Sequence, residues 1–372
     1  MLGRPDRHFP TVHIGGTNGK GSTCAFVANE LRARGWRVGL YTSPHLVSPT
    51  ERITVDGVPI AEEAFTEWTS QLKPHIERLD ASFFEATTAL ALADLAARGV
   101  DIAVIEVGLG GRLDATNVVT PLVSAVTKIA LEHVEYLGSD LKGIAREKAG
   151  IAKPRVPFVT GESDPDIRAE IVKEARARGA QPVITVDTTL RPRKDTKLGL
   201  RGQHQVANAL VAHAILNALP KPFGPSPGGK KLPASFADAY IPGRFEIRGK
   251  WVFDVAHNPD GMKVVADAIR TAVPKLRRPI HALVGIRNDK DWRAMLEILR
   301  PVVDRLILTV PPSIPVMQRW SLEDVDALSH FDPDFAHALE DIQAGAGTVL
   351  VTGSFHTVGD AMARLPGFAP VG

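Results

Sequence analysis

This 372-residue sequence has little of several features that mark particular classes of protein. Its single cysteine, Cys24, allows no intramolecular disulfide and no zinc site with several cysteine ligands, so a reducing, cytoplasmic compartment is expected. Lys and Arg number 44 against 42 Asp and Glu, and a net charge of only +2 excludes a protein that binds nucleic acid through bulk charge. No apolar run approaches the roughly 18 residues that a membrane helix needs, so no membrane partner is expected.

The composition is that of an ordinary soluble globular protein. Hydrophobic residues make up 44% and charged residues 23% of the sequence. At roughly 100–200 residues per domain, the length predicts two or three domains, which can bury a core without disulfides or a structural metal. The first ten residues carry two prolines and three charges, so they are not expected to be a signal peptide.

Apolar runs that predict strands alternate with helix-like segments in the first part of the chain. Asp101–Val107 is apolar almost throughout, as expected for a strand that is covered on both faces. Such alternation predicts a mainly parallel sheet with helices on both sides. The predicted strands are Thr11–Ile14, Arg37–Tyr41, Asp101–Val107, Val123–Ile129 and Val156–Thr160, and the predicted helices are Cys24–Arg34 and Phe84–Arg98.

A segment rich in proline and glycine, Pro220–Pro233, predicts a surface loop near a domain boundary. After it the alternation restarts, and the sequence therefore predicts an α/β protein with a larger domain over residues 1–240 and a smaller, Rossmann-like α/β domain over 241–372. The predicted elements of the second domain are strands at Trp251–Val255, Ala282–Gly285, Leu306–Val310 and Thr348–Thr352, and helices at Gly261–Val273, Trp292–Arg300 and His356–Arg364.

The segment Gly15–Thr23 reads GGTNGKGST and lies between a predicted strand and a predicted helix. Its glycines allow the backbone to turn around a phosphate with its N–H groups pointing inward, and the start of the helix adds roughly half a positive charge. It departs from the G-x-x-x-x-G-K-[ST] pattern, because Ile14 occupies the first glycine position and Gly21 separates Lys20 from Ser22. The sequence predicts a variant phosphate loop, with a glycine-rich turn that binds no ligand as the alternative.

Polar residues follow several predicted strands, where α/β sheets bind ligands. Glu106 lies near the end of a buried strand, and a buried carboxylate needs compensation. Mg²⁺ on phosphates would supply it, and an ion pair with an arginine such as Arg112 is the alternative. Ser43 and Asp254 also follow strands; Asp254 could hold a ribose or an adenine edge, and simple turn chemistry is the alternative for both.

Nine motifs resemble one family, the folylpolyglutamate synthase/dihydrofolate synthase branch of the Mur-ligase superfamily. In chain order, from about Phe9 to Met362, they are GGTNGKGST, TSPHL, FFE, EVGLGGRLDATN, LEH, REKAGI, PGRFE, DVAHNP and VTGS. The resemblance implies a P-loop ATPase domain followed by a ligase domain. It also implies a reaction in which MgATP phosphorylates a carboxylate of dihydropteroate or a folate, and L-glutamate attacks the acyl phosphate.

The resemblance implies roles for the residues at matching positions. Gly19, Lys20, Gly21 and Ser22 would bind phosphate, with Thr17 and Asn18 in the same loop, and Asn208, Arg244 and Asp254 would be further nucleotide contacts. Ser43, Glu106 and His133 would be magnesium ligands, at two sites, and Ser82 and Leu113 would line a pterin pocket. Lys148 would carry a carbamate, and Lys20, Lys148 and His133 would be the catalytic residues. A monovalent cation is a further cofactor that the resemblance allows, and a monomer is expected.

Without the resemblance, the local sequence around Lys148 indicates a structural role. Glu147 and Lys148 would form an ordinary pair at a helix end, with Lys148 offsetting the helix dipole. Carbamylation needs the free amine, so it requires partial burial and a neighbouring cation, such as Mg²⁺ or Arg146, to lower the pKa of Lys148.

The chain departs from the family at two places. The family has a longer helical segment before the first strand, part of which contacts the pterin, whereas here about ten residues precede Thr11. Phe355 and His356 follow VTGS where the family often shows Leu-Tyr, which affects the glutamate side or the interdomain surface.

Two other functions compete with this interpretation. A Mur ligase that acts on a cell-wall precursor would need a uridine-diphosphate-binding domain, for which this sequence has no residues. A nucleotide-binding paralogue without catalysis would have lost the metal and lysine positions, which are present here. The sequence leaves open whether the enzyme makes dihydrofolate, extends polyglutamates, or does both.

Overall fold

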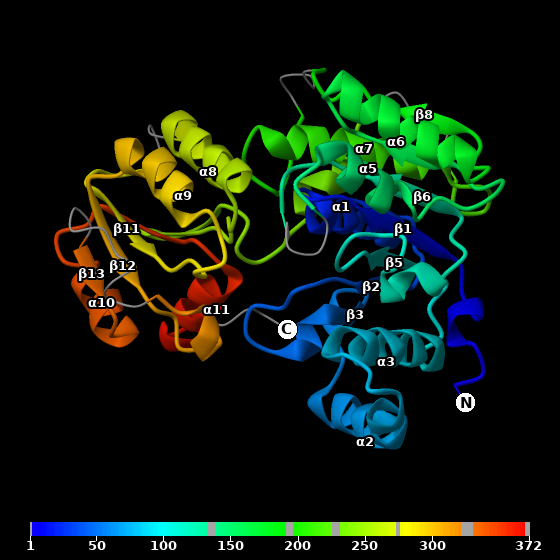
Figure 1. Ribbon diagram of the computed structural model, residues 1–372, viewed down its shortest axis with the longest axis horizontal. Coiled ribbons are helices and arrows are strands. Elements are labelled where there is room, and N and C mark those ends of the chain that lie inside the picture. Colours follow the sequence, from blue (N-terminus) through cyan, green and yellow to red (C-terminus); the bar gives the residue numbers. More distant parts are fainter. Residues whose placement is uncertain are drawn as a thin grey trace. The chain divides into compact units, whose positions relative to one another are not determined.

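The computed structural model describes residues 2–132, 138–190, 196–224, 231–272, 276–320 and 330–368. Its contacts divide the chain into two compact units. The first unit holds the chain up to Gly199 together with His204–Tyr240, and the second holds Leu200–Gln203 and the chain from Ile241. Each has its own sheet, so the predicted α/β architecture is confirmed (Figure 1).

The first unit is built on a sheet of eight strands in the order β4-β3-β2-β5-β1-β6-β7-β8. The six strands from β2 to β8 in that order are parallel, and β3 and β4 form an antiparallel edge. The strands are β1 (Thr11–Gly15), β2 (Val38–Tyr41), β3 (Ile53–Val55), β4 (Val58–Pro59), β5 (Ile102–Glu106), β6 (Val123–Val126), β7 (Phe158–Thr160) and β8 (Val183–Thr185).

Helices cover both faces of this sheet (Figure 1). Helices α2 and α3 pack over β2, β3 and β5, and α5 and α6 pack over β6 and β7 on the same face, while α1 and α7 pack together on the other. Coverage on both faces explains why β1, β5, β6 and β7 are buried at every position. The helices are α1 (Lys20–Ala33), α2 (Glu62–Leu79), α3 (Phe83–Ala97), α5 (Leu141–Ala149), α6 (Pro165–Ala177) and α7 (His204–Ala218).

The second unit is a sheet of six strands in the order β13-β12-β11-β14-β10-β9, in which only β9 is antiparallel to its neighbour. Helices α8 and α9 form one hydrophobic core with it, and α10 and α11 lie on the other face (Figure 1). The strands are β9 (Glu246–Arg248), β10 (Trp251–Phe253), β11 (Ile280–Val284), β12 (Arg305–Thr309), β13 (His330–Asp332) and β14 (Thr348–Thr352). The helices are α8 (Pro259–Ala272), α9 (Trp292–Leu299), α10 (Phe335–Asp341) and α11 (Phe355–Arg364).

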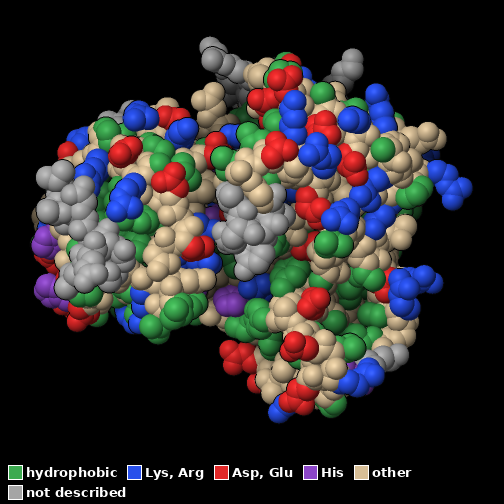
Figure 2. Space-filling view, viewed as in Figure 1, with side chains coloured by type: hydrophobic (Ala, Val, Ile, Leu, Met, Phe, Trp, Pro, Cys, Tyr) green, Lys and Arg blue, Asp and Glu red, His purple; other side chains and the backbone are tan. Residues whose placement is uncertain are grey.

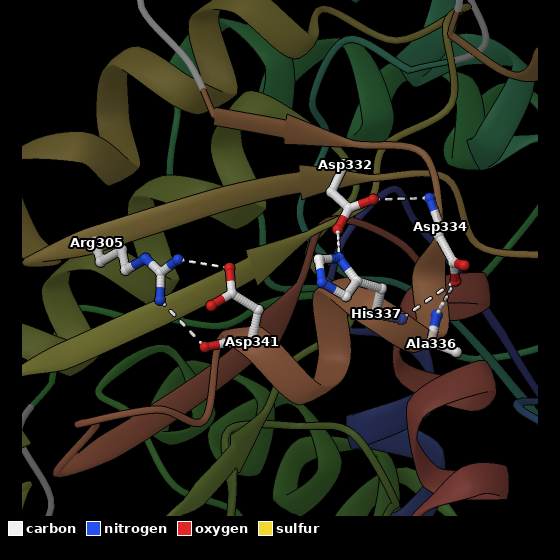
Figure 3. A network of polar contacts seen from close by, with 6 residues as sticks. All are labelled: Arg305, Asp332, Asp334, Ala336, His337 and Asp341. Atoms are coloured by element: carbon white, nitrogen blue, oxygen red, sulfur yellow. Dashed lines mark hydrogen bonds and ion pairs between the residues drawn. The ribbon is translucent and has the colours of Figure 1, made fainter.

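Polar contacts tie α10 to the outer strands of this sheet (Figure 3). Asp334 caps the helix by accepting from the amides of Ala336 and His337 at 2.9 and 3.1 Å. Asp332, at the end of β13, contacts His337 Nδ1 at 2.5 Å, and Arg305 of β12 forms an ion pair with Asp341 at 2.6 Å. The network fixes both ends of this short helix.

Most boundaries of the predicted elements lie within two residues of those observed, and two differ by more, for physical reasons. Helix α1 begins at Lys20, four residues before the predicted Cys24, because its first turn is polar and lacks the apolar spacing on which that prediction rested. Strand β6 ends at Val126 instead of Ile129, because the chain then leaves the sheet and hydrogen-bonds to the Gly15–Asn18 segment. Residues 225–230 of the predicted loop Pro220–Pro233 lie outside the described residues.

None of the described helices combines the length and apolar character that crossing a bilayer requires. On the face shown in Figure 2, Lys and Arg side chains alternate with Asp and Glu and form no large patch of one sign, in keeping with the net charge of +2.

Candidate active site

The GGTNGKGST segment connects the carboxyl end of β1 to the start of α1. Gly19 caps the helix with a positive φ of 90°, and a Cβ atom there would overlap Oδ1 of Asn208. Gly16 has a φ of 135°, and a Cβ atom there would overlap Oγ1 of Thr127. Both positions therefore require glycine, and the turn lies against α7 on one side and the end of β6 on the other.

The segment that follows β6 holds this loop in place. The amides of Thr17 and Asn18 donate to the carbonyl of Lys128 at 2.8 and 3.3 Å, and Thr127 Oγ1 donates to the Asn18 carbonyl at 2.8 Å. The amides of Thr17 and Asn18 therefore face the segment after β6, in an isolated antiparallel bridge outside the strands of the sheet. The amides suited to a phosphate are those of Lys20, Gly21 and Ser22, which have no acceptor within the helix because they begin it.

Lys20 places its ammonium group beside this helix start. Its Nζ donates to the carbonyl of Thr17 at 3.0 Å, so the side chain folds back over the loop. The predicted phosphate-binding cation therefore lies within the loop that it would serve, and a phosphate would replace a backbone carbonyl as its acceptor.

Lys148 lies in the last turn of α5 and is 3% exposed. Its Nζ donates to the carbonyl of Gly16 in the phosphate loop at 3.1 Å. Burial first, and then the charge of Lys20, lower the pKa of Lys148 from 10.5 to about 7. Burial and the neighbouring ammonium group disfavour the charged form of Lys148, so a larger fraction of the side chain is the neutral amine, which is the nucleophilic form.

The surroundings of Lys148 correct three expectations. Glu147 forms its ion pair with Arg112 at 3.0 Å, so it does not pair with Lys148 on the surface, and Arg112 does not pair with Glu106. Arg146 forms ion pairs with Asp140 and Glu170 at 3.4 and 3.1 Å, and the cation that lowers the pKa of Lys148 is Lys20.

Close backbone packing brings the EVGLGGRLDATN and REKAGI motifs together. A Cβ atom on Gly111 would lie 2.8 Å from the carbonyl oxygens of Glu147 and Lys148, and the Arg112 amide donates to the Glu147 carbonyl at 2.9 Å. The glycine pair before Arg112 therefore allows the end of α5 to approach the sheet and bury Lys148.

Glu106 and Ser43 meet at the carboxyl edge of the same sheet. Strands β2 and β5 are parallel neighbours with Tyr41 opposite Ile105, so the residues that follow them are adjacent. The Ser43 amide donates to Glu106 Oε2 at 3.1 Å, and Glu106 is 3% exposed. A buried carboxylate beside a serine hydroxyl is a donor set that suits Mg²⁺, which is commonly held by one or two carboxylates together with substrate phosphates and water.

His133, the third predicted magnesium ligand, lies outside the described residues, so the second metal site stays a prediction. Over the ranges that the structure covers, no three His, Cys, Asp or Glu side chains form a metal-binding cluster.

The predicted pterin-pocket residues Ser82 and Leu113 are both exposed, and Ser82 lies at the start of α3. Ser82 caps this helix by accepting from the Glu85 amide at 3.3 Å, while Glu85 accepts from the Ser82 amide at 2.8 Å. Leu113 is 78% exposed and Phe83 57% exposed. The Arg52 guanidinium lies 5.3 Å from the Phe83 ring centre. Phe83 belongs to the FFE motif, but neither Phe83 nor Arg52 was predicted from the sequence to have a role at this site.

Asn208 is buried in the first turns of α7, in the same unit as the phosphate loop. Its Nδ2 donates to Gln205 Oε1 at 2.9 Å, which leaves Oδ1 facing Gly19. The structure therefore brings this predicted nucleotide contact to the start of α1.

Arg244 and Asp254 come together in the second unit. Asp254 follows β10, is 8% exposed, and accepts from the amides of Phe245 and Ala256 at 2.8 and 2.9 Å. Burial raises the pKa of Asp254 to about 6, and the charge of Arg244 opposes this rise. Asp254 thus fixes the turn that carries Arg244, in keeping with the turn chemistry given above as the alternative role of this residue.

Comparisons with known proteins agree along the chain. The family model described as Mur ligase middle domain matches residues 14–192, and the one described as Mur ligase, glutamate ligase domain matches residues 243–355. Dihydrofolate synthase/folylpolyglutamate synthase of Escherichia coli (strain K12) is 35% identical over 374 residues, covering 94% of this chain and 85% of the relative.

Solved structures are similar over nearly the whole chain. E. coli FolC in complex with DHPP and ADP gives a TM-score of 0.84 at 34% identity, covering 97% of this chain and 90% of that one. The bifunctional folylpolyglutamate synthase/dihydrofolate synthase of Yersinia pestis c092, complexed with AMPPNP and Mn ion, gives 0.82 at 31% identity, covering 97% and 90%.

A phosphate loop at the carboxyl edge of a parallel sheet, followed by a unit that matches a glutamate ligase domain, defines an ATP-dependent ligase of the Mur type. Within that class the chain belongs to the folylpolyglutamate synthase/dihydrofolate synthase family, which confirms the resemblance seen in its motifs.

Proposed function

We propose that this chain uses ATP to join L-glutamate to dihydropteroate, to a reduced folate or its polyglutamate, or to both. The observation that carries the proposal is the convergence of three groups on one phosphate loop. Lys20 lies over the loop, Lys148 is buried against it, and Ser43 and Glu106 end strands of the same sheet. Family membership supplies the acceptor and the amino acid.

The reaction follows from the weakness of a carboxylate as an electrophile. A carboxylate oxygen of the substrate attacks the γ-phosphorus, the bond to the β,γ-bridging oxygen breaks, and ADP leaves. The ammonium group of glutamate gives one proton to water, and the resulting amine attacks the acyl carbon. Phosphate then leaves with the former carboxylate oxygen and takes up the second proton as the amide forms. The loop amides from Lys20 to Ser22 and the Lys20 ammonium group stabilise the charge of the phosphoryl group during transfer, so positioning and electrostatics provide most of the catalysis.

Ser43 and Glu106 are the described residues that would hold Mg²⁺, with His133 proposed at a second site. Bound there, Mg²⁺ would neutralise charge on the phosphate oxygens. The position of Glu106 supports this assignment, because its carboxylate is buried at the carboxyl edge of the sheet and accepts from the Ser43 amide.

We propose that Lys148 reacts with CO₂ to form a carbamate. The amine nitrogen forms a bond to the carbon of CO₂ and releases a proton, so that a cation becomes an anion. At pH 7 a pKa of about 7 leaves about half of Lys148 as the free amine, against about 0.04% for an ordinary lysine. Carbamylation would also convert the repulsion between Lys148 and Lys20 into an attraction.

The two units are proposed to divide the work. The first, over residues 1–240, supplies the phosphate loop, Asn208 and the pterin-side residues Ser82 and Leu113. The second, over 241–372, supplies the further nucleotide contacts Arg244 and Asp254. We propose that the enzyme acts as a monomer in the cytoplasm, with a monovalent cation as a further cofactor.

The test is product formation by the purified chain. Dihydropteroate and tetrahydrofolate, each with ATP, Mg²⁺ and L-glutamate, are followed by ADP release and by mass spectrometry of the glutamylated product. Release of ADP that depends on both glutamate and either acceptor supports the proposal and shows which acceptor is used. ATP binding without either product would favour a nucleotide-binding protein without ligase activity.

Replacing Glu106 with glutamine is expected to lower kcat at least about a hundredfold at millimolar Mg²⁺, because the variant loses the proposed anionic ligand of the metal site. The Mg²⁺ concentration for half-maximal activity should rise as well. Asp94→Asn is the matched control, since Asp94 is also 3% exposed but pairs with Arg98 in α3. Equal Mg²⁺ dependence of Glu106→Gln and wild type would remove Glu106 from the metal site.

A further inference from the structure

The Phe355 ring contacts two polar side chains, Arg244 and His257, that come from a much earlier part of the chain. The Arg244 guanidinium carbon lies 5.2 Å from the centre of the Phe355 ring. The rings of His257 and Phe355 have centres 5.5 Å apart and are tilted by 46°. Phe355 begins α11 after β14, whereas Arg244 precedes β9 and His257 precedes α8, so the three meet where the parallel neighbours β10 and β14 end.

Hydrogen bonds fix the backbone at the start of α11, from which the Phe355 side chain projects. Ser354 caps α11 by accepting from the Thr357 amide at 3.1 Å, and its Oγ donates to the Gly285 carbonyl at 2.8 Å. His257 is also fixed, because its Nδ1 lies 2.9 Å from the Val255 carbonyl, which can only accept a hydrogen bond. These contacts fix the backbone at the start of α11, to which the Phe355 ring is attached, and the neighbouring His257 ring, and none of them involves Arg244.

Arg244, in contrast, has few other restraints. Among the residues that the structure describes, no carboxylate lies within ion-pair distance of its guanidinium, and Asp254 acts on it only through longer-range attraction. The face of an aromatic ring attracts a guanidinium and also limits its rotation. An aliphatic side chain, such as the leucine that the family often shows here, would fill the space without that attraction.

We propose that Phe355 is a positioning residue that holds the Arg244 guanidinium in the orientation in which it contacts the nucleotide. The inference rests on the proposed function, because it takes Arg244 as a nucleotide contact. A side chain that is oriented before binding loses less conformational freedom on binding, so the ring would strengthen ATP binding without touching ATP.

The test is a double-mutant cycle on the full-length enzyme, read as KM for ATP against kcat. Phe355→Leu is expected to raise KM for ATP about two- to fivefold, the fold-change of one partly exposed cation–π contact, and to change kcat less than about twofold. Phe355→Tyr keeps a ring and should behave as wild type. In the Arg244→Ala background, Phe355→Leu should have no further effect on KM.

Phe368→Leu is the matched control. Phe368 is a half-buried ring of the same unit, with the Arg248 guanidinium 5.6 Å from its centre, so its loss costs a similar contact away from Arg244. It should leave KM for ATP unchanged, and thermal unfolding of each variant separates loss of fold from loss of binding.

The possible outcomes separate the role of Phe355 from the role of Arg244. If Arg244→Ala raises KM but Phe355→Leu does not, or if the two effects multiply, the role of Phe355 is overturned while the nucleotide role of Arg244 stands. If Arg244→Ala leaves KM unchanged, the nucleotide role fails, and the inference fails with it.

Discussion

Replacing Lys20 with alanine is expected to lower kcat by about a thousandfold or more and to leave the fold intact. The Lys20 ammonium group lies 3.0 Å from the Thr17 carbonyl beside the start of α1, where the proposed mechanism places the γ-phosphoryl group during transfer. Removing one preorganised donor from such a site costs about 10²–10³ in rate, and Lys20 also carries a full charge. Steady-state kinetics with saturating ATP measure the loss.

The structure explains why this variant should still fold. Lys20 is partly exposed and forms no ion pair in the described part of the chain, so alanine opens no core cavity. Its removal also relieves the repulsion that lowers the pKa of Lys148. Lys20→Arg, which keeps the charge, is the control for charge against shape. Near-normal turnover in a stably folded Lys20→Ala protein would contradict the proposed role.

Replacing Lys148 with alanine is expected to lower kcat at least about a hundredfold, with part of the activity restored by formate or acetate. The variant lacks the amine that we propose forms the carbamate, and a small carboxylate in the space that the side chain leaves would replace the missing anion. Lys142→Ala is the matched control, because Lys142 lies on the same helix but is exposed. A fully active Lys148→Ala protein that ignores added carboxylate would show that the lysine is structural.

The pH dependence of this site has a defined sign. Because the pKa of Lys148 is lowered to about 7, the folded chain gives up a proton that the unfolded chain keeps up to pH 10.5. Between a pH of about 7 and 10.5, the free energy of unfolding of the CO₂-free enzyme therefore rises with pH. The stability that is gained in this range is lost again as the pH falls from 10.5 to about 7. At a fixed concentration of dissolved CO₂, the carbamylated fraction should likewise rise through pH 7.

Local patterns in the sequence predicted the central strands of both sheets, but not the edge strands β3, β4, β8, β9 and β13 or the helices α2, α5, α6, α7 and α10. Buried parallel strands such as Asp101–Val107 and Thr348–Thr352 are nearly continuous apolar runs, and glycines end the helices between them. The first turn of α1 was missed because phosphate-loop residues carry no apolar period, although the same residues identified the loop.

The choice of partners could not be predicted from local sequence. Glu147 is next to Lys148 but pairs with Arg112, because Gly111 lets the end of α5 approach the sheet. The same approach buries Lys148, which a helix-end pattern places on the surface. The contact between Arg244 and Phe355 likewise depends on β10 lying beside β14, a register that no motif encodes.

If the substrate carboxylate is activated as an acyl phosphate, one of its oxygen atoms must leave with the phosphate, and isotope labelling can follow that transfer. Dihydropteroate or tetrahydrofolate labelled with ¹⁸O in the reacting carboxylate is turned over with ATP, Mg²⁺ and L-glutamate, and the released phosphate is analysed by mass spectrometry. The account predicts one ¹⁸O atom in each phosphate for whichever acceptor is used. Glutamylated product accompanied by unlabelled phosphate would contradict it.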